Sequence, residues 1–273
     1  MTSTPTARLL PVLALLCALG FVATFLVALH TGRGFHDDDA LFRHVSGNAA
    51  LPVRAAGAAR ALLLAIDGAF VAVTTILIVA LAMVQKQIGR AVAAVAIVVC
   101  SVGSVEALKH GLPRLDSAIP VGRAPTFPSG HASIAVSLGL ALVLAAPPVL
   151  RPAAALVGAA YAGGVGLSLI LLGWHFPSDV VGAFFICGFW AAAIAAALRD
   201  TEARPAVSGA GVLVAVAAVA FGLIVAAVLA SRHPAAVDSL RSARSVVATA
   251  AAIGVLSVAV FGAFTPLVGE ARE

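Results

Sequence analysis

The chain reads FPSGHASIAVSLGLALVLAAP from Phe127 to Pro147, a short polar motif that runs directly into an apolar segment. A second motif, GWHFPSD from Gly173 to Asp179, comes later and also opens an apolar segment. Such segments are expected to be helices in a bilayer, where backbone polar groups must be satisfied within the segment itself. The two stretches therefore predict a bundle of membrane helices with a histidine at the start of each motif-bearing run.

The composition supports this interpretation. Of the 273 residues, 62% are hydrophobic and 11% are charged, and the mean hydropathy is +1.09. Because a soluble domain has about 25% charged residues, this balance argues against a soluble enzyme. The net charge of +5 is spread over many loops without a basic cluster, so we expect no nucleic-acid partner.

Eight apolar runs approach the length of about 20 residues that a bilayer-spanning helix needs. They cover residues 9–30, 61–84, 91–109, 131–147, 153–173, 179–198, 207–230 and 246–268. No alternating pattern suggests a barrel, and the first run is too long for a signal-peptide core. The expected fold is an all-α polytopic membrane helix bundle.

The polar segments divide this bundle. Residues 1–200 hold six runs and are predicted to form a core, while residues 201–273 are predicted to form a linker plus two additional transmembrane helices. Residues 31–60 and 110–130 are interpreted as polar loops, the second interrupted by several prolines. The charged segment from Arg199 to Pro205 is interpreted as a linker.

An even number of spans puts both termini on one side, so Lys109–His131 and His175 share the opposite face. The total of Lys and Arg on each side does not decide the orientation, but the short loops with Lys86, Arg90 and Arg151 favour an inner N-terminus. We expect an integral protein of a bacterial-type plasma membrane, with its site on the outer face.

The first motif has the features of an anion site at a helix start. Ser129 is a natural N-cap, and the amides of Ser129, Gly130 and His131 are expected to point out of the helix. Such amides attract phosphate, and a glycine allows close approach. The alternative is an ordinary Ser-Gly cap with an interfacial histidine.

The second motif places His175 four residues before Asp179. Pro177 disfavours a single helix over both, so we expect His175 in a turn and Asp179 at the start of the next helix. A carboxylate that accepts from one ring nitrogen leaves the other as a base or nucleophile. The alternative is an aspartate that only complements the helix dipole.

Three cations near the first motif are candidates for holding a dianionic phosphate: Lys109, Arg114 and Arg123. Each is also explained as a cation at the membrane boundary, and Lys109 as the partner of Glu106 on one helix face. The only acidic run is Asp37-Asp38-Asp39, where cation binding is an alternative.

Together these residues resemble the integral-membrane type-2 phosphatidic acid phosphatase superfamily, the lipid phosphate phosphatases. The first motif of this chain matches the family's second motif, Pro-Ser-Gly-His, from Pro128 to His131. The family's third motif is matched at Ser168, Gly173, His175, Pro177, Ser178 and Asp179. The resemblance implies a six-helix phosphatase core over residues 1–200, to which the last two helices are added.

Two departures bear on activity. Leu169 stands where the family has the third-motif arginine, a phosphate ligand. The family also has an earlier motif, a lysine and an Arg-Pro pair after the third helix. Here Leu115 follows Arg114 in place of proline, and Asp116 occupies the usual arginine spacing. Arg114 or Arg123 would have to supply the missing charge.

The family mechanism, carried to matching positions, makes His175 the nucleophile at phosphorus, oriented by Asp179. His131 then protonates the leaving oxygen and activates water. The implied phosphate ligands are Lys109, Arg114, Ser129 and Gly130. The resemblance implies neither a metal nor another cofactor.

The leading hypothesis is therefore a membrane phosphatase acting on a lipid phosphate or isoprenoid diphosphate and releasing inorganic phosphate. Because of Leu169, a family member that binds a phospholipid or protein partner without turnover is an alternative. A transporter is a third, although no internal repeat or pair of broken helices supports it.

Overall fold

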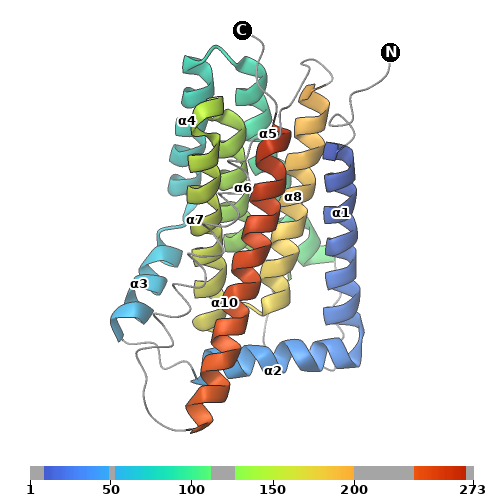
Figure 1. Ribbon diagram of the computed structural model, residues 1–273, viewed down its shortest axis with the longest axis vertical. Coiled ribbons are helices and arrows are strands. Elements are labelled where there is room, and N and C mark those ends of the chain that lie inside the picture. The colour runs from blue at the N-terminus through green and yellow to red at the C-terminus, as the bar shows by residue number, and fades with distance from the viewer. Residues whose placement is uncertain (1–8, 49–52, 112–126, 200–236, 269–273) are drawn as a thin grey trace.

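The computed structural model describes residues 9–48, 53–111, 127–199 and 237–268, and every regular element in them is helical. Figure 1 shows long helices standing side by side, with one helix lying across an end of the bundle. Five of the described helices are long and apolar enough to cross a membrane. The predicted all-α polytopic bundle is therefore confirmed, and the chain is an integral membrane protein.

The five spans agree closely with runs expected from the sequence. They are Leu9–Leu29, Ile88–Lys109, Pro148–Leu171, Pro177–Leu198 and Val247–Leu267. The corresponding helices are α1 (Leu9–Thr24, continued by a π-helical turn over Phe25–Leu29), α5 (Ile88–Gly111), α7 (Arg151–Leu171), α8 (Pro177–Arg199) and α10 (Val237–Phe264). The run at 207–230 and residues 200–205 of the linker lie outside the described residues.

The expected span over residues 61–84 is broken. Helices α3 (Val53–Leu64) and α4 (Gly68–Val84) meet at an angle of 71°. Asp67 lies at the break, and its carboxylate accepts a hydrogen bond from the Phe70 N–H at 2.7 Å. The acid therefore starts a new helix, because its side chain satisfies an amide that has no partner within α4.

Helix α6 (Gly130–Ala145) lies at the centre of the bundle. With 16 residues it is shorter than a full span, and most of its residues are buried. It packs against α4, α5, α7 and α8. The helix that begins with the first histidine motif is thus held by neighbours on several sides.

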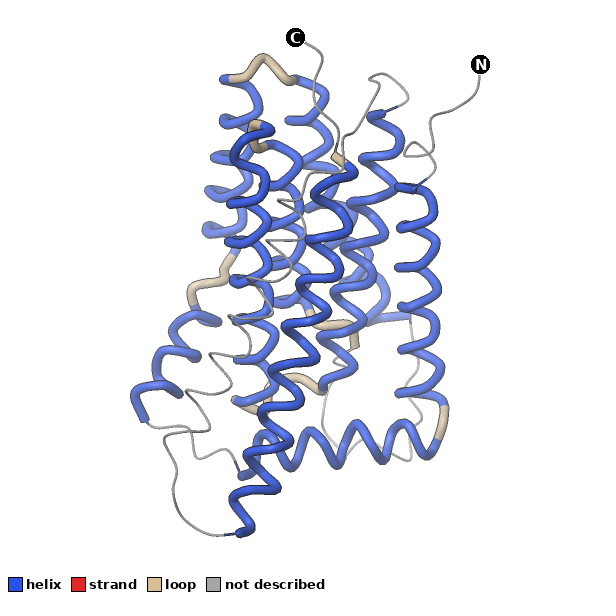
Figure 2. The backbone as a smooth tube through the Cα atoms, viewed as in Figure 1, coloured by secondary structure: helices blue, strands red, loops and turns tan. Residues whose placement is uncertain are grey.

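The prediction that residues 31–60 form a loop was wrong, because α2 (Gly32–Asn48) and most of α3 lie there. Figures 1 and 2 show α2 lying across the end of the bundle. Phe42 and Val45 are buried on one side of α2, whereas Arg43 and His44 are exposed on the other. This amphipathic pattern explains how a polar stretch folds as a helix against the bundle.

The last helix fills a notch between α6 and α7. A Cβ on Gly139 would lie 2.7 Å from the Phe261 ring, and one on Gly158 would lie 2.6 Å from it. The Phe261 side chain, from α10, is fully buried. Small residues allow membrane helices to approach closely, and here they also admit an aromatic ring.

Candidate active site

Phe127 anchors the first motif to two other helices. Its side chain is buried, and its ring centroid lies 5.5 Å from that of Phe21 and 6.0 Å from that of Phe25. A Cβ on Gly182 of α8 would lie only 2.5 Å from the Phe127 ring. Glycine at position 182 therefore lets the ring sit directly on α8, which fixes the chain just before α6.

Ser129 caps α6 and also joins it to the second motif. Its hydroxyl oxygen accepts from the Ala132 N–H at 3.4 Å. Its own N–H donates to the backbone carbonyl of Asp179 at 3.0 Å. The Ser129 amide points out of α6, as expected, but it is not free to bind an anion, because α8 provides its acceptor.

The second histidine lies in a turn, as expected from Pro177. Helix α7 ends at Leu171, and α8 begins at Pro177. Between them Gly173 has φ of +69°, in the left-handed region that favours glycine. The N–H groups of Trp174 and His175 donate to the Leu169 carbonyl at 2.9 and 3.3 Å, which closes the turn.

Asp179 holds the His175 ring. The distance between His175 Nδ1 and Asp179 Oδ2 is 3.1 Å, and the same oxygen accepts from the Phe176 N–H at 3.0 Å. Asp179 is fully buried, and the His175 side chain is 13% exposed. This arrangement favours a proton on Nδ1 and leaves Nε2 available as a base or nucleophile.

His131 lies in the first turn of α6, beside the second motif and outside the five candidate spans. Its ring meets the Trp174 ring edge-on at a centroid distance of 5.9 Å. Burial, followed by the positive charges of His175 and Lys109, lowers the pKa of His131 below its ordinary value. Through its contact with Trp174, the residue before His175, the His131 ring lies at the same end of the bundle as the second motif.

Lys109 comes from the end of α5 and lies over the start of α6. Its Nζ is 2.6 Å from Glu106 Oε1, so the ion pair considered from the sequence is present. A Cβ on Gly130 would lie 2.9 Å from the same Nζ. Glycine at position 130 therefore allows the amine to approach the α6 backbone. The other two expected cations, Arg114 and Arg123, lie outside the described residues.

Leu169, at the position of the expected arginine, is fully buried in the apolar core. Its backbone contributes to the site by closing the turn before His175, but its side chain supplies no charge. Within the part of the chain that the structure describes, Lys109 is a cation that lies over the start of α6, near His131.

The acidic run on α2 contributes one side chain to this region. Asp38 is buried, and its carboxylate accepts hydrogen bonds from Ser178, directly before Asp179. Sequence reasoning missed this contact. Asp38, Phe42 and Val45 follow the spacing of one buried helix face, but this spacing does not identify Ser178 as the partner of Asp38.

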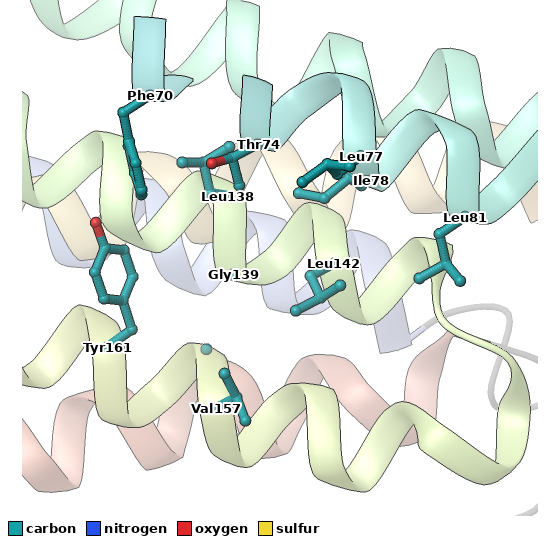
Figure 3. Close-up of a pocket in the computed structure, with 11 residues that line it drawn as sticks. Phe70, Thr74, Leu77, Ile78, Leu81, Leu138, Gly139, Leu142, Val157 and Tyr161 are labelled. Carbon is teal, nitrogen blue, oxygen red and sulfur yellow. The ribbon is translucent and has the colours of Figure 1, made fainter. Parts of the chain in front are cut away.

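We find no cluster of three or more His, Cys, Asp or Glu side chains placed to hold a metal ion among the residues that the structure describes. An apolar cavity of about 370 Å³ lies between α4, α6 and α7. Figure 3 shows Phe70 and Tyr161 pointing toward one another at one end of it. None of the motif residues lines this cavity, so it is separate from the histidine site.

Comparison with known proteins gives one family. Residues 17–203 match the family model described as the PAP2 superfamily. No curated protein and no solved structure matches the chain. The matched segment includes both histidine motifs and the helices that carry them. Since it covers more than half of the chain, this protein belongs to the PAP2 superfamily.

Proposed function

We propose that this chain is a phosphatase that hydrolyses a lipid phosphate or isoprenoid diphosphate through a phosphohistidine on His175. The observation that carries the proposal is the His175–Asp179 contact of 3.1 Å, together with the contact between a second histidine, His131, and Trp174 directly before His175. Membership of the PAP2 superfamily supports phosphatase chemistry on lipid-type phosphates.

The first step is an in-line attack of His175 Nε2 on phosphorus. A P–N bond forms while the P–O bond to the lipid breaks, and the lipid oxygen takes a proton from His131. Asp179 holds the Nδ1 proton and stabilises the positive charge that develops on the ring. A His131 imidazolium with a lowered pKa is a stronger acid than an ordinary histidine, which suits donation to the leaving oxygen.

The second step returns the enzyme to its starting state. Neutral His131 removes a proton from water, and the resulting hydroxide attacks phosphorus and breaks the P–N bond. Inorganic phosphate leaves, and His175 is restored. The Lys109 ammonium and the Gly130 amide lie at the start of α6, where they would bind phosphoryl oxygens. We assign Ser129, Arg114 and Arg123 to the same oxygens.

The substrate we propose has its tail in the bilayer and its phosphate at the end of the bundle where α2 lies. We place this end on the outer face of the membrane, because the short loops with Lys86, Arg90 and Arg151 favour an inner N-terminus. A site at a helix start suits an anion, and the apolar outer surfaces of the spans suit the attached tail.

Phosphate release by the purified chain tests the proposal directly. Phosphatidic acid and an isoprenoid diphosphate would be supplied in mixed micelles containing a metal chelator. Wild type should release phosphate, and His175→Ala should release none above background. His44→Ala is the matched control, because His44 is an exposed histidine on α2. Equal rates for wild type and His175→Ala would contradict the proposal, and loss of wild-type activity in chelator would contradict its metal independence.

A second candidate function is binding of a phospholipid without turnover. The buried leucine at position 169 favours this alternative. A phosphate bound at the histidine site would lack the arginine that, in the family, stabilises the transition state. Under this alternative, wild type and His175→Ala would bind phosphatidic acid vesicles equally and neither would release phosphate.

A further inference from the structure

We propose that Asp38 of α2 is a positioning residue for the His175–Asp179 pair, an inference that rests on the proposed function. Both carboxylate oxygens of Asp38 accept hydrogen bonds from Ser178. The Ser178 N–H donates to Oδ1 at 3.1 Å, and the Ser178 hydroxyl donates to Oδ2 at 2.6 Å. Both residues are buried, and they are separated by 140 positions in the chain.

The three adjacent aspartates of α2 have different surroundings. Successive side chains on a helix are turned by about 100°, so neighbouring residues cannot share one environment. Asp37 is exposed, and Asp39 pairs with Arg43 at 2.8 Å. Of the three, Asp38 is the one whose carboxylate reaches Ser178. Asp37 and Asp39 therefore lie away from Ser178, and Asp38 alone of the three points toward the site.

Ser178 is an effective point at which to hold the site. It lies in the first turn of α8, where backbone amides have no acceptor within the helix. A carboxylate there is favoured by the helix dipole, and its hydrogen bonds are strengthened by its charge. Ser178 is bonded directly to Asp179, so fixing Ser178 fixes the carboxylate that orients His175.

Other contacts from α2 reach the same turn. The rings of Phe42 and Phe176 lie 4.5 Å apart between centroids. A Cβ on Gly173 would lie 3.3 Å from the Ser46 Cβ. Helix α2, which crosses this end of the bundle in Figure 1, therefore contacts the turn both before and after His175. Asp38 adds hydrogen bonds to these packing contacts between α2 and the turn.

The test compares Asp38→Ala with Asp37→Asn in the full-length chain, using phosphatidic acid in mixed micelles. Rates are expressed per mole of folded protein. Asp38→Ala should lower kcat at least about 10-fold with KM within about twofold, because a small displacement of a reacting group is costly. Asp37→Asn should leave both constants within about twofold of wild type. A purely structural role for Asp38 would lower the folded yield but leave kcat unchanged.

A double-mutant cycle tests the contact itself. Adding Ser178→Ala to Asp38→Ala should cause little further loss in kcat, because the hydroxyl contact is already gone. Asp38→Asn has nearly the same size and carries the test if Asp38→Ala does not fold; we expect it to lower kcat at least about threefold.

The outcomes separate the two proposals. If both Asp38 variants retain wild-type kcat while His175→Ala is inactive, the positioning role is wrong and the proposed function stands. Fully additive losses in the cycle would also overturn the positioning role. If wild type releases no more phosphate than His175→Ala, both proposals fail.

Discussion

The backbone N–H of Ser129 donates a hydrogen bond to the backbone carbonyl of Asp179 across 3.0 Å. This bond joins the cap of α6 to the first turn of α8, and so connects the two histidine motifs directly. Because both partners belong to the backbone, most side-chain substitutions leave the bond in place. Its geometry instead depends on how the flanking side chains pack.

Asp179→Asn tests how the carboxylate orients His175. The Asn oxygen can take the place of Asp179 Oδ2, where it would accept from the Phe176 N–H and from His175 Nδ1. The variant therefore lacks the negative charge that stabilises the His175 ring as positive charge develops on it during attack on phosphorus. We expect kcat to fall by at least about 100-fold, measured as phosphate release.

Asn has nearly the same size as Asp, so the substitution should disturb the folded structure little. Thermal unfolding checks this. A variant that keeps the melting temperature of wild type and also keeps its kcat would show that the charge of Asp179 does not matter to the reaction.

Gly182→Ala tests the packing under the first motif. Its Cβ would lie 2.5 Å from the Phe127 ring, and that ring is buried and has little room to move. We expect a loss of about 1–3 kcal/mol of stability, together with reduced kcat, because α6 is displaced from α8. Thermal unfolding and phosphate release measure the two effects.

Gly103→Ala is the matched control, since nothing lies within 4 Å of its Cβ position on α5. A smaller side chain at position 127 should make room for the methyl group that Gly182→Ala adds. The double variant Gly182→Ala, Phe127→Leu should therefore be more stable than Gly182→Ala alone. Additive losses in the pair would argue against a clash between these two residues.

Lys109→Met tests the charge acting on His131. A positive neighbour disfavours the protonated imidazole, so removing it should raise the pKa of His131. If His131 donates a proton, activity declines above that pKa, and the alkaline limb of the kcat profile should move to higher pH. The profile is recorded with saturating substrate, because Lys109 is also assigned to phosphate binding.

Lys86→Met is the control, because Lys86 is exposed and follows α4 at its far end from Asp67. A limb that stays in place in Lys109→Met, or moves to lower pH, would show that this limb does not report His131.

Leu169→Arg tests whether the family's arginine can be restored. The leucine is fully buried in the apolar core, so a guanidinium there would lose its hydration without an assured partner. We expect a loss of several kcal/mol of stability and no gain in phosphate release. Leu169→Met, with a similar volume, should cost less than about 1.5 kcal/mol. If wild type releases no phosphate and a well-folded Leu169→Arg variant does, the result would instead favour binding without turnover as the function of the wild type.

Much of the fold follows from hydropathy, because a bilayer forces long apolar runs into helices. The break at Asp67 was missed, since a single acid within an apolar run does not lower its average hydropathy enough to divide it. Helix α2 was also missed. Its residues are too polar for a span, and its helical period becomes meaningful only once another surface is known to bury Phe42 and Val45.

The sequence predicted the contact between His175 and Asp179, but not the contacts that hold these residues in position. His175 and Asp179 carry a local spacing that indicates their contact, and the structure has it at 3.1 Å. Asp38 and Phe127 act through residues far along the chain, Ser178 and Gly182, so no local pattern identifies their partners. Contacts of that kind depend on how helices are arranged, which apolar periodicity alone does not specify.

The Phe261 ring in the notch between Gly139 and Gly158 bears on where the chain can be shortened. The family match ends at residue 203, yet this ring comes from beyond that point and touches both the helix that starts at the first motif and the helix that leads to the second. A truncation after the matched segment would keep every motif residue but open a void between those two helices. Helix α10 is therefore part of the packing between α6 and α7, and its removal should destabilise the segment that the family model matches.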